Sequence, residues 1–285
     1  MLDQSAANLG VSVIVAVHNE EKYLHLCLRS LVSQNHPSFE IIVVDDGSTD
    51  NTLEISQAFS NQYSSIQALR QQHLGWTYGR NLGARMATGT ILVFVDGDME
   101  FDPDYLIRLV EPITCHGAAG TFSKEEYVAN FDNKWAFCWN LNDGLVTNRR
   151  HPDDFPDKHH SFRAVRKDIF VSVGGYDHLG SGSDFSLSMK IGELAEAAPG
   201  AICYHYNPGS LNEVFSQGRW YGRGIRIQKT WRNVIRHSLP LSVIGSLRRA
   251  WRYLLPHFVL FKIVYDVGVS LGLLESLLFP NRTYR

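Results

Sequence analysis

The sequence predicts an α/β fold in which one sheet carries helices on both faces, with a basic helical extension at its C-terminal end. Three short segments rich in valine and isoleucine each stop at polar residues, and segments with helical spacing of apolar side chains lie between them. Strands connected through helices pair in parallel, so their ends converge on one crevice. We expect two domains, residues 1–213 and residues 214–285.

The first predicted strand, 11–17, ends at His18-Asn19-Glu20. Leucines recur at helical spacing after it, which predicts a helix from about residue 21 to residue 34. A second strand, 41–44, then leads into a polar turn and another helix, for which residues 48–50 offer candidate N-caps. The order so far is strand, helix, strand, helix.

The third predicted strand, 91–95, is apolar throughout and runs directly into Asp96-Gly97-Asp98. A continuous apolar run is typical of a strand buried on both faces. Asp and Gly favour turns, but two carboxylates at the carboxyl end of a buried strand also suit a metal-bound phosphate. The other predicted elements are a helix within 75–89, a short helix over 104–110, a strand near 118–122 and a helix that begins at Asp184.

The net charge of −2 hides an uneven distribution. Residues 1–213 hold 15 basic and 27 acidic side chains, whereas residues 214–285 hold 12 basic and 2 acidic ones. No acid occurs from Val214 to Tyr265. Such asymmetry is typical of a segment that meets an anionic surface, either nucleic acid or phospholipid headgroups.

The four cysteines are widely spaced, which argues against a zinc site and a disulfide framework. The polar N-terminal segment lacks the apolar run of a secretory signal. We therefore expect a cytoplasmic protein.

Asp98, with Asp96 beside it, is the candidate for holding a divalent cation, because Mg²⁺ and Mn²⁺ take oxygen ligands. Mn²⁺ also accepts an imidazole, and His205 is the candidate for that ligand. A partly buried histidine at a strand end is an equally good interpretation of His205.

Three further polar side chains have two interpretations each. Asp46 is either a helix cap or an acceptor for a nucleobase N–H, and we expect it to be free because nearer residues can cap the helix. Asn81 either donates to a phosphate or sugar or is an exposed helix position. Asp184 is either an N-cap or a general base.

These segments together resemble family 2 glycosyltransferases, which have the GT-A fold with its Rossmann-like nucleotide-binding sheet. Four ordered blocks carry the resemblance, at 11–21, 40–50, 79–84 and 95–98, and it returns weakly at 174–177 and 183–187. Ordered blocks are far more specific than any one motif.

The resemblance implies transfer of a sugar from a nucleoside-diphosphate sugar to an acceptor hydroxyl, with inversion at the anomeric carbon. It places Ala16, His18 and Glu20 along the nucleoside, and Asp46 at the base. It also assigns Asp96, Gly97 and Asp98 to the ribose, diphosphate and metal, and it makes Asp184 the general base.

The chain departs from the family pattern in places. Ser183-Asp184 stands where the family usually has Glu-Asp, and His18 replaces an aromatic or small residue. Processive members carry Gln-x-x-Arg-Trp, and Gln217-Gly218-Arg219-Trp220 is one residue short. This difference favours a single transfer per encounter.

Arginines and apolar residues alternate at helical spacing within 219–255, with Trp251 near the border of the apolar face. This pattern predicts a basic amphipathic helix at the inner face of the plasma membrane, and no nucleic-acid partner. A helix packed on the catalytic domain with its arginines in water is the alternative. The apolar stretch 258–279 contains Lys262, Asp266 and Glu275, so we expect it to be a poor membrane span. A peripheral enzyme would meet a saccharide or lipid-linked acceptor.

Two other functions compete. A sugar-phosphate nucleotidyltransferase would need a glycine-rich basic loop after the first strand, where this chain has His18-Asn19-Glu20-Glu21. A catalytically silent module that docks on a membrane through its basic segment would need none of the carboxylates. The sequence does not identify the donor sugar, the nucleobase or the acceptor.

Overall fold

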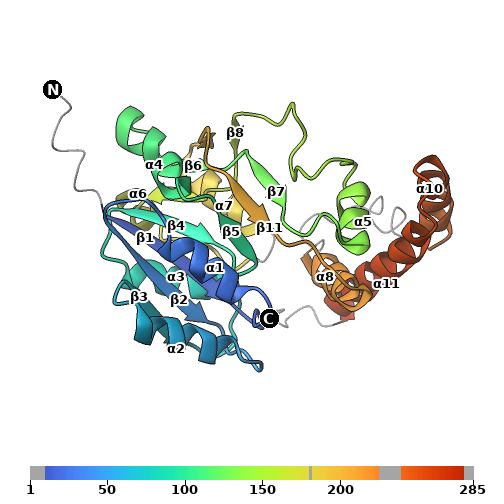
Figure 1. The fold of residues 1–285 in the computed structure, drawn as a ribbon, viewed down its shortest axis with the longest axis horizontal. Helices are drawn as coiled ribbons and strands as arrows, with labels where there is room; N and C mark the ends of the chain where they lie inside the picture. Colours follow the sequence, from blue (N-terminus) through green and yellow to red (C-terminus); the bar gives the residue numbers. More distant parts are fainter. Residues whose placement is uncertain (1–9, 180–181, 225–238, 279–285) are drawn as a thin grey trace. The chain divides into compact units, whose positions relative to one another are not determined.

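The computed structural model describes residues 10–179, 182–224 and 239–278, and their contacts divide the chain into two units (Figure 1). Unit 1 contains residues up to 127 together with 151–205, and unit 2 contains 128–150 and the residues from 206 onward. The second unit thus includes a central segment of the sequence in addition to the basic C-terminal part.

Unit 1 is built on an eight-stranded sheet with the order β3-β2-β1-β4-β9-β6-β10-β8. The first four of these strands are parallel, whereas β9 runs antiparallel to β4 and to β6. A three-stranded sheet has the order β5-β11-β7. The strands are β1 (Val11–Val17), β2 (Phe39–Asp45), β3 (Ile66–Arg70), β4 (Ile91–Val95), β5 (Met99–Phe101), β6 (Gly120–Phe122), β7 (Glu126–Val128), β8 (Lys158–His159), β9 (Ala164–Arg166), β10 (Ala195–Ala197) and β11 (Cys203–His205).

Alternate side chains of the parallel strands enter two separate cores, so helices cover both faces of the large sheet as expected. One core joins Val13, Val15 and Val93 to α1, α2 and α4, and the other joins Ile14 and Phe94 to α3, α6 and α7. The helices of unit 1 are α1 (Leu24–Val32), α2 (Thr52–Gln62), α3 (Trp76–Met86), α4 (Tyr105–His116), α6 (Lys167–Ser172) and α7 (Ser183–Ile191).

The three strands that were expected to form the sheet do so, in the parallel register that brings their carboxyl ends together. Val17 of β1 lies opposite Asp45 of β2, and Val15 lies opposite Val95 of β4. The polar residues that follow each strand therefore share one edge of the sheet, and this edge positions the candidate site.

Several predicted bounds differ from the structure. β3 was not expected, because Ile66–Arg70 is short and only its first residue is buried. The helix expected over 104–110 continues to His116 as α4, since Pro112 leaves the buried apolar face of the helix intact. The N-cap of α2 is Asn51 instead of one of residues 48–50.

Unit 2 is helical, with a core that includes Val214, Phe258, Phe261 and Val269. The glycines at 218 and 222 of one helix and at 268 and 272 of another lie where the two backbones approach closely, because an added Cβ at any of them would meet backbone within 2.7 Å. The helices are α5 (Lys134–Asn142), α8 (Leu211–Gly224), α10 (Leu239–Arg252) and α11 (His257–Leu278). The arginines expected to extend the basic stripe at 226, 232 and 236 lie outside the described residues.

α11 corrects one expectation. Among the described residues it is the helix that is long and apolar enough to cross a membrane by length and composition, with 39% of its most apolar window buried in the protein. Its charged residues are paired, because Lys262 bonds Asp266 at 2.6 Å and Glu275 bonds Arg219 and Arg223. The three charges therefore do not exclude a membrane span.

Candidate functional site

The turns after β1 and β2 hold each other in place. Asn19 has a positive φ of 57°, and its side-chain oxygen accepts from the backbone N–H of Thr49 at 2.8 Å. The N–H of Asn19 donates to Ser48 Oγ, and that of Glu20 donates to Thr52 Oγ1 at 2.7 Å. These cross-links fix the backbone of both turns, so the side chains that project from them are pre-positioned.

Asp96, which follows β4, lies between two arginines. Arg80 donates to its Oδ1 at 2.7 Å, and Arg163 donates to its Oδ2 at 2.9 Å. Burial acts to raise the pKa of Asp96, but the guanidinium groups of Arg163 and Arg80 outweigh it and hold the pKa well below its usual range. Asp96 is therefore ionised and its oxygens already have strong donors.

Asp98 lies beside His205 from β11. This proximity, which the sequence predicts, is required if both side chains are to bind one cation. The Nε2 atom of His205 is 3.2 Å from each carboxylate oxygen of Asp98. On the other side of the ring, Nδ1 is 2.9 Å from Glu126, whose side chain is 7% exposed. A carboxylate on the outer nitrogen is the arrangement that orients metal-binding histidines, so Asp98 and His205 fit a divalent cation.

Glu20 belongs to this acidic group, although the sequence analysis placed it along the nucleoside. Burial and the neighbouring charges of Asp98 and Asp96 together raise the pKa of Glu20 to about 8. Gly97 makes the approach possible, because a Cβ there would lie 2.6 Å from Val17 and 3.3 Å from Glu20 Cγ. A cation bound here would favour the ionised form of Glu20.

Asp184 lies in the first turn of α7, and its Oδ1 is 3.9 Å from Arg80 Nη1. Its side chain is 36% exposed, so it is open to a substrate. The N-cap of α7 is Gly182, which corrects the alternative interpretation of Asp184 as the cap. A negative charge near a helix N-terminus is favourable.

Asp46 corrects another expectation, because its carboxylate is 2% exposed and is fully engaged. Oδ1 accepts from Leu74 N and from the side chain of Gln71, and Oδ2 accepts from Gly75 N and contacts His73 Nδ1 at 2.9 Å. These four contacts fill the acceptor positions of a carboxylate. Asp46 therefore holds the loop before α3 and is not free to read a base directly.

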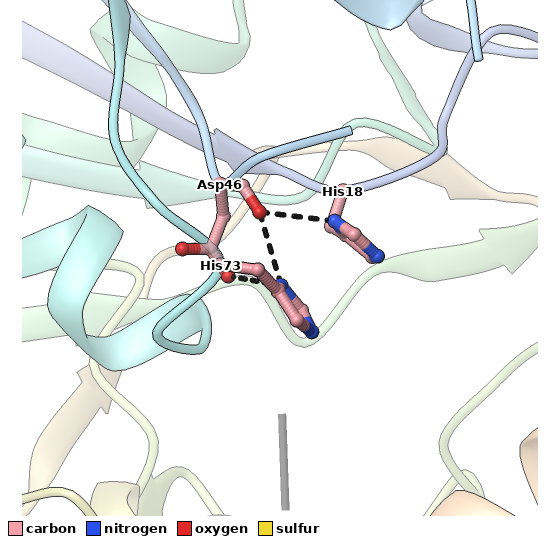
Figure 2. A group of neighbouring side chains, drawn as sticks. All are labelled: His18, Asp46 and His73. Carbon is pink, nitrogen blue, oxygen red and sulfur yellow. Dashed lines mark hydrogen bonds and ion pairs between the residues drawn. The ribbon is translucent and has the colours of Figure 1, made fainter. Parts of the chain in front are cut away.

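Figure 2 shows His18 and His73 beside Asp46. Their rings are stacked, with centroids 3.9 Å apart, and the Nδ1 atoms of both lie 3.0 Å from the backbone oxygen of Asp46. The three residues offer ligand atoms within 4.8 Å of one another. Among the described residues, they form the group of three His, Cys, Asp or Glu side chains that is close enough to hold a metal ion. Because both Nδ1 atoms point to a carbonyl oxygen, they act as donors there, and the rings present an imidazole platform at the end of β1.

Asn81 and Ala16 have packing roles. Both ends of the Asn81 amide bond the backbone of Tyr176, at 2.9 Å each, so the expected donation from Asn81 to a phosphate or sugar is replaced by a tie between α3 and the 174–177 turn. Ala16 packs against Gly79, where a Cβ would lie 3.1 Å from the Ala16 methyl.

A continuous line of polar contacts joins the predicted base to the predicted metal ligands. Three residues in it, Arg80, Arg163 and Glu126, were not among the predicted site residues. Arg80 stands within the 79–84 block and could have been noticed there, whereas no local pattern marks the other two. The contacts are Asp184–Arg80 at 3.9 Å, Arg80–Asp96 at 2.7 Å, Asp96–Arg163 at 2.9 Å, Arg163–Glu126 at 3.6 Å, Glu126–His205 at 2.9 Å and His205–Asp98 at 3.2 Å.

The large sheet with helices on both faces, and the polar residues at the carboxyl ends of its parallel strands, define an α/β protein. Residues 12–174, more than half of the chain, match Glycosyl transferase family 2, and the chain belongs to that family. It is 39% identical over 103 residues to the glycosyltransferase GlyA of Streptococcus pneumoniae, which covers 36% of this chain and 15% of GlyA. It is 38% identical over 110 residues to the glycosyltransferase AglE of Haloferax volcanii, which covers 38% of this chain and 36% of AglE.

Solved structures show the same fold. The mannosyltransferase PcManGT from Pyrobaculum calidifontis, in complex with GDP-Man and Mn²⁺, has a TM-score of 0.60 and 17% identity over 93% of this chain and 86% of its own. Residues 1–349 of TarS from S. aureus, in complex with UDP-GlcNAc, have a TM-score of 0.59 and 18% identity over 97% of this chain and 93% of their own. The expected GT-A fold is confirmed.

Proposed function

We propose that this protein transfers a sugar from a nucleoside-diphosphate sugar to an acceptor hydroxyl, with inversion at the anomeric carbon. The observation that carries the proposal is the line of contacts from Asp184 to Asp98 along one edge of the sheet. In this line the exposed carboxylate of Asp184, which we propose as the base, lies on one side of an arginine pair, and Asp98 and His205, which we propose as the cation ligands, lie on the other. Inverting transfer needs a base near the acceptor and a positive charge near the leaving group.

Asp98 and His205 would hold the divalent cation, Mn²⁺ or Mg²⁺, and the neighbouring carboxylate of Glu20 would add negative charge near it. When bound, the cation supplies Lewis-acid stabilisation of the departing diphosphate. Glu126 keeps the imidazole of His205 oriented with Nε2 towards Asp98. Mixed oxygen and nitrogen ligands favour Mn²⁺ over Mg²⁺.

Asp184 would accept the proton of the acceptor hydroxyl. Arg80 lies between this carboxylate and Asp96, and the cation–π contact of Arg80 with Trp76, at 4.5 Å, holds the guanidinium in place. These contacts hold Asp184 at a fixed position relative to Asp96, which we assign to the diphosphate site. No covalent sugar–enzyme intermediate is required, which is consistent with inversion.

For the donor, we assign Ala16, His18 and the loop held by Asp46 to the nucleoside, and Asp96 with Gly97 to the ribose and diphosphate. PcManGT binds GDP-Man and TarS binds UDP-GlcNAc, so nucleoside-diphosphate sugars of both bases are the donors to test.

We also propose a saccharide or lipid-linked acceptor, a single transfer per encounter and a peripheral location on the cytoplasmic face of a membrane. The free state of all four cysteines fits a reducing compartment. The shortened Gln217-Gly218-Arg219-Trp220 sequence, which lies within α8, supports the single transfer.

The test uses the purified full chain with a panel of UDP-, GDP- and dTDP-sugars, with Mn²⁺ or with EDTA. We expect release of nucleoside diphosphate from one donor with Mn²⁺, and a rate lowered about 100-fold or more by Asp184→Asn. Asp168→Asn is the matched control, because Asp168 also lies in the first turn of a helix but pairs with Arg166 at the start of α6. Binding of the donor to the Asp184→Asn variant, measured by thermal shift, should persist.

Two results would overturn the proposal. Failure to release nucleoside diphosphate from every donor would support the silent module. Formation of a nucleotide-sugar and pyrophosphate from a nucleoside triphosphate and a sugar phosphate would support the nucleotidyltransferase, which family membership does not favour.

A further inference from the structure

One face of α10 exposes large apolar side chains to solvent. Ile244 is 66% exposed, Leu247 is 54% exposed and Trp251 is 83% exposed. Spacings of three, four and seven residues place these three side chains on one side of the helix. The opposite side is the one that packs into unit 2, since Ser246 and Ala250 are almost fully buried.

Leu254, two residues after the end of α10, is a further exposed apolar side chain and comes at a cost to the backbone. It is 83% exposed and has a positive φ of 52°, a conformation that favours glycine. The N–H of Leu255 donates to the carbonyl of Ala250 at 2.8 Å, so this turn ends the helix. Neither packing within the described residues nor backbone preference explains a leucine here, whereas a partner that takes up the side chain would.

Arginines border the apolar face. Arg248 and Arg252 are exposed and lie four residues apart, one position after Leu247 and Trp251 respectively. Arg249 points elsewhere, because its guanidinium donates to the carbonyls of Leu141 and Asn142 at the end of α5. The sequence has no acid between Val214 and Tyr265, so no carboxylate within that segment offsets this positive border.

α11 exposes further leucines while its other side is committed to α8. The glycines of the two helices let the backbones meet, and Glu275 is held by Arg219 and Arg223. The exposed fractions of its outward leucines range from 41% to 63%, at Leu260, Leu271, Leu274, Leu277 and Leu278. Close glycine packing is typical of helix pairs in lipid, and it leaves these leucines available.

We propose that the docking face formed by Ile244, Leu247, Trp251 and Leu254, with Arg248 and Arg252 at its border, inserts into the interfacial region of an anionic phospholipid bilayer. Aliphatic side chains and a tryptophan next to arginines match the acyl boundary and the phosphate layer of such a surface. A second copy of the chain fits less well, because a two-fold contact through this face would bring the arginines of both copies together.

This inference specifies the membrane partner of the proposed function, and it is tested without donor or acceptor. The assay is co-sedimentation of the full chain with vesicles of phosphatidylcholine alone or with one quarter phosphatidylglycerol, at low and at high salt. We expect at least tenfold stronger binding to the anionic vesicles at low salt, and at least a tenfold loss in the Leu247→Glu/Trp251→Glu double variant. Val171→Glu, at an apolar residue of unit 1 that is 60% exposed, is the matched control and should bind like the parent.

Leu254→Gly keeps the experiment decisive if the double variant fails to fold. Glycine suits the positive φ, so this variant should melt at a higher temperature than the parent and yet bind anionic vesicles several-fold more weakly. Equal vesicle binding by the parent and Leu254→Gly would overturn the proposal. A second pair of results would also overturn it: the parent does not bind vesicles, and light scattering shows a concentration-dependent dimer of the parent that Leu247→Glu/Trp251→Glu abolishes. Sugar transfer is judged separately, by the release of nucleoside diphosphate.

Discussion

Glu20 makes the acidic group around Asp98 sensitive to pH, and Glu20→Gln should remove that sensitivity. The pKa of Glu20 in the folded protein is about 8, against an ordinary value of 4.5, because burial and the charges of Asp98 and Asp96 oppose ionisation. The folded state therefore holds a proton that the unfolded state releases above about pH 4.5. Stability from this proton is fully present below pH 4.5 and is lost as the pH rises through 8.

The size of the effect follows from the same values. Each pKa unit corresponds to about 1.4 kcal/mol, so the free energy of unfolding should fall by at most about 4 kcal/mol between pH 5 and pH 8.5 through this group alone. Glu20 is partly exposed, and solvent screening lowers the expected fall to about 2 kcal/mol. Glutamine has no proton to lose, so the Glu20→Gln variant should lack this fall.

The assay is urea unfolding in EDTA, followed by circular dichroism at pH values from 5 to 8.5. The parent should lose about 2 kcal/mol more than Glu20→Gln over this range, and Glu54→Gln, an exposed glutamate in the first turn of α2, should behave like the parent. When Mn²⁺ replaces EDTA, it should stabilise the parent more at pH 8 than at pH 6, because an ionised Glu20 adds negative charge beside the proposed ligands. Parallel pH profiles for the parent and Glu20→Gln would refute the reasoning.

Two further predictions concern the metal ligands and the packing of the sheet. Glu126→Gln should weaken Mn²⁺ binding about 10- to 100-fold, measured by electron paramagnetic resonance, because Glu126 orients His205; unchanged affinity would exclude that role. Gly83→Ala should lower the free energy of unfolding by about 1–3 kcal/mol, since its Cβ would lie 2.5 Å from Ile14 Cγ2. Gly245→Ala, in a helix with open space around it, should instead be neutral or stabilising by up to about 1 kcal/mol.

The parallel strands could be predicted from the sequence because a strand that is buried on both faces has an unbroken run of apolar residues. β1, β2 and β4 are almost wholly buried, so they read as unbroken apolar runs that end where the sheet meets solvent. β3 lies at the edge of the sheet and buries one side chain, and its run of residues carries no such pattern. The detection of a strand thus depended on how deeply the fold buries it.

The positions of Asp46, Asp96 and Asp98 were predictable for the same reason, since these residues follow closely on those strands. The partners of the carboxylates were not. Arg163 reaches Asp96 because β9, far along the chain, pairs antiparallel with β4. Glu126 reaches His205 because their strands belong to the same three-stranded sheet. Such pairings depend on contacts between distant segments, which local spacing does not record.

The sequence by itself determined the strands of the parallel sheet, the edge at which their polar residues gather and the family of the chain, because periodicity and ordered blocks are local properties. The tertiary structure alone decided what each polar side chain does. It engaged Asp46 and Asn81 in holding loops, drew Glu20 into the acidic group and joined Asp184 to Asp98 through two arginines and Glu126. The physical reason is that hydrogen bonding and charge depend on which groups lie within a few ångströms, and the folded chain sets those distances.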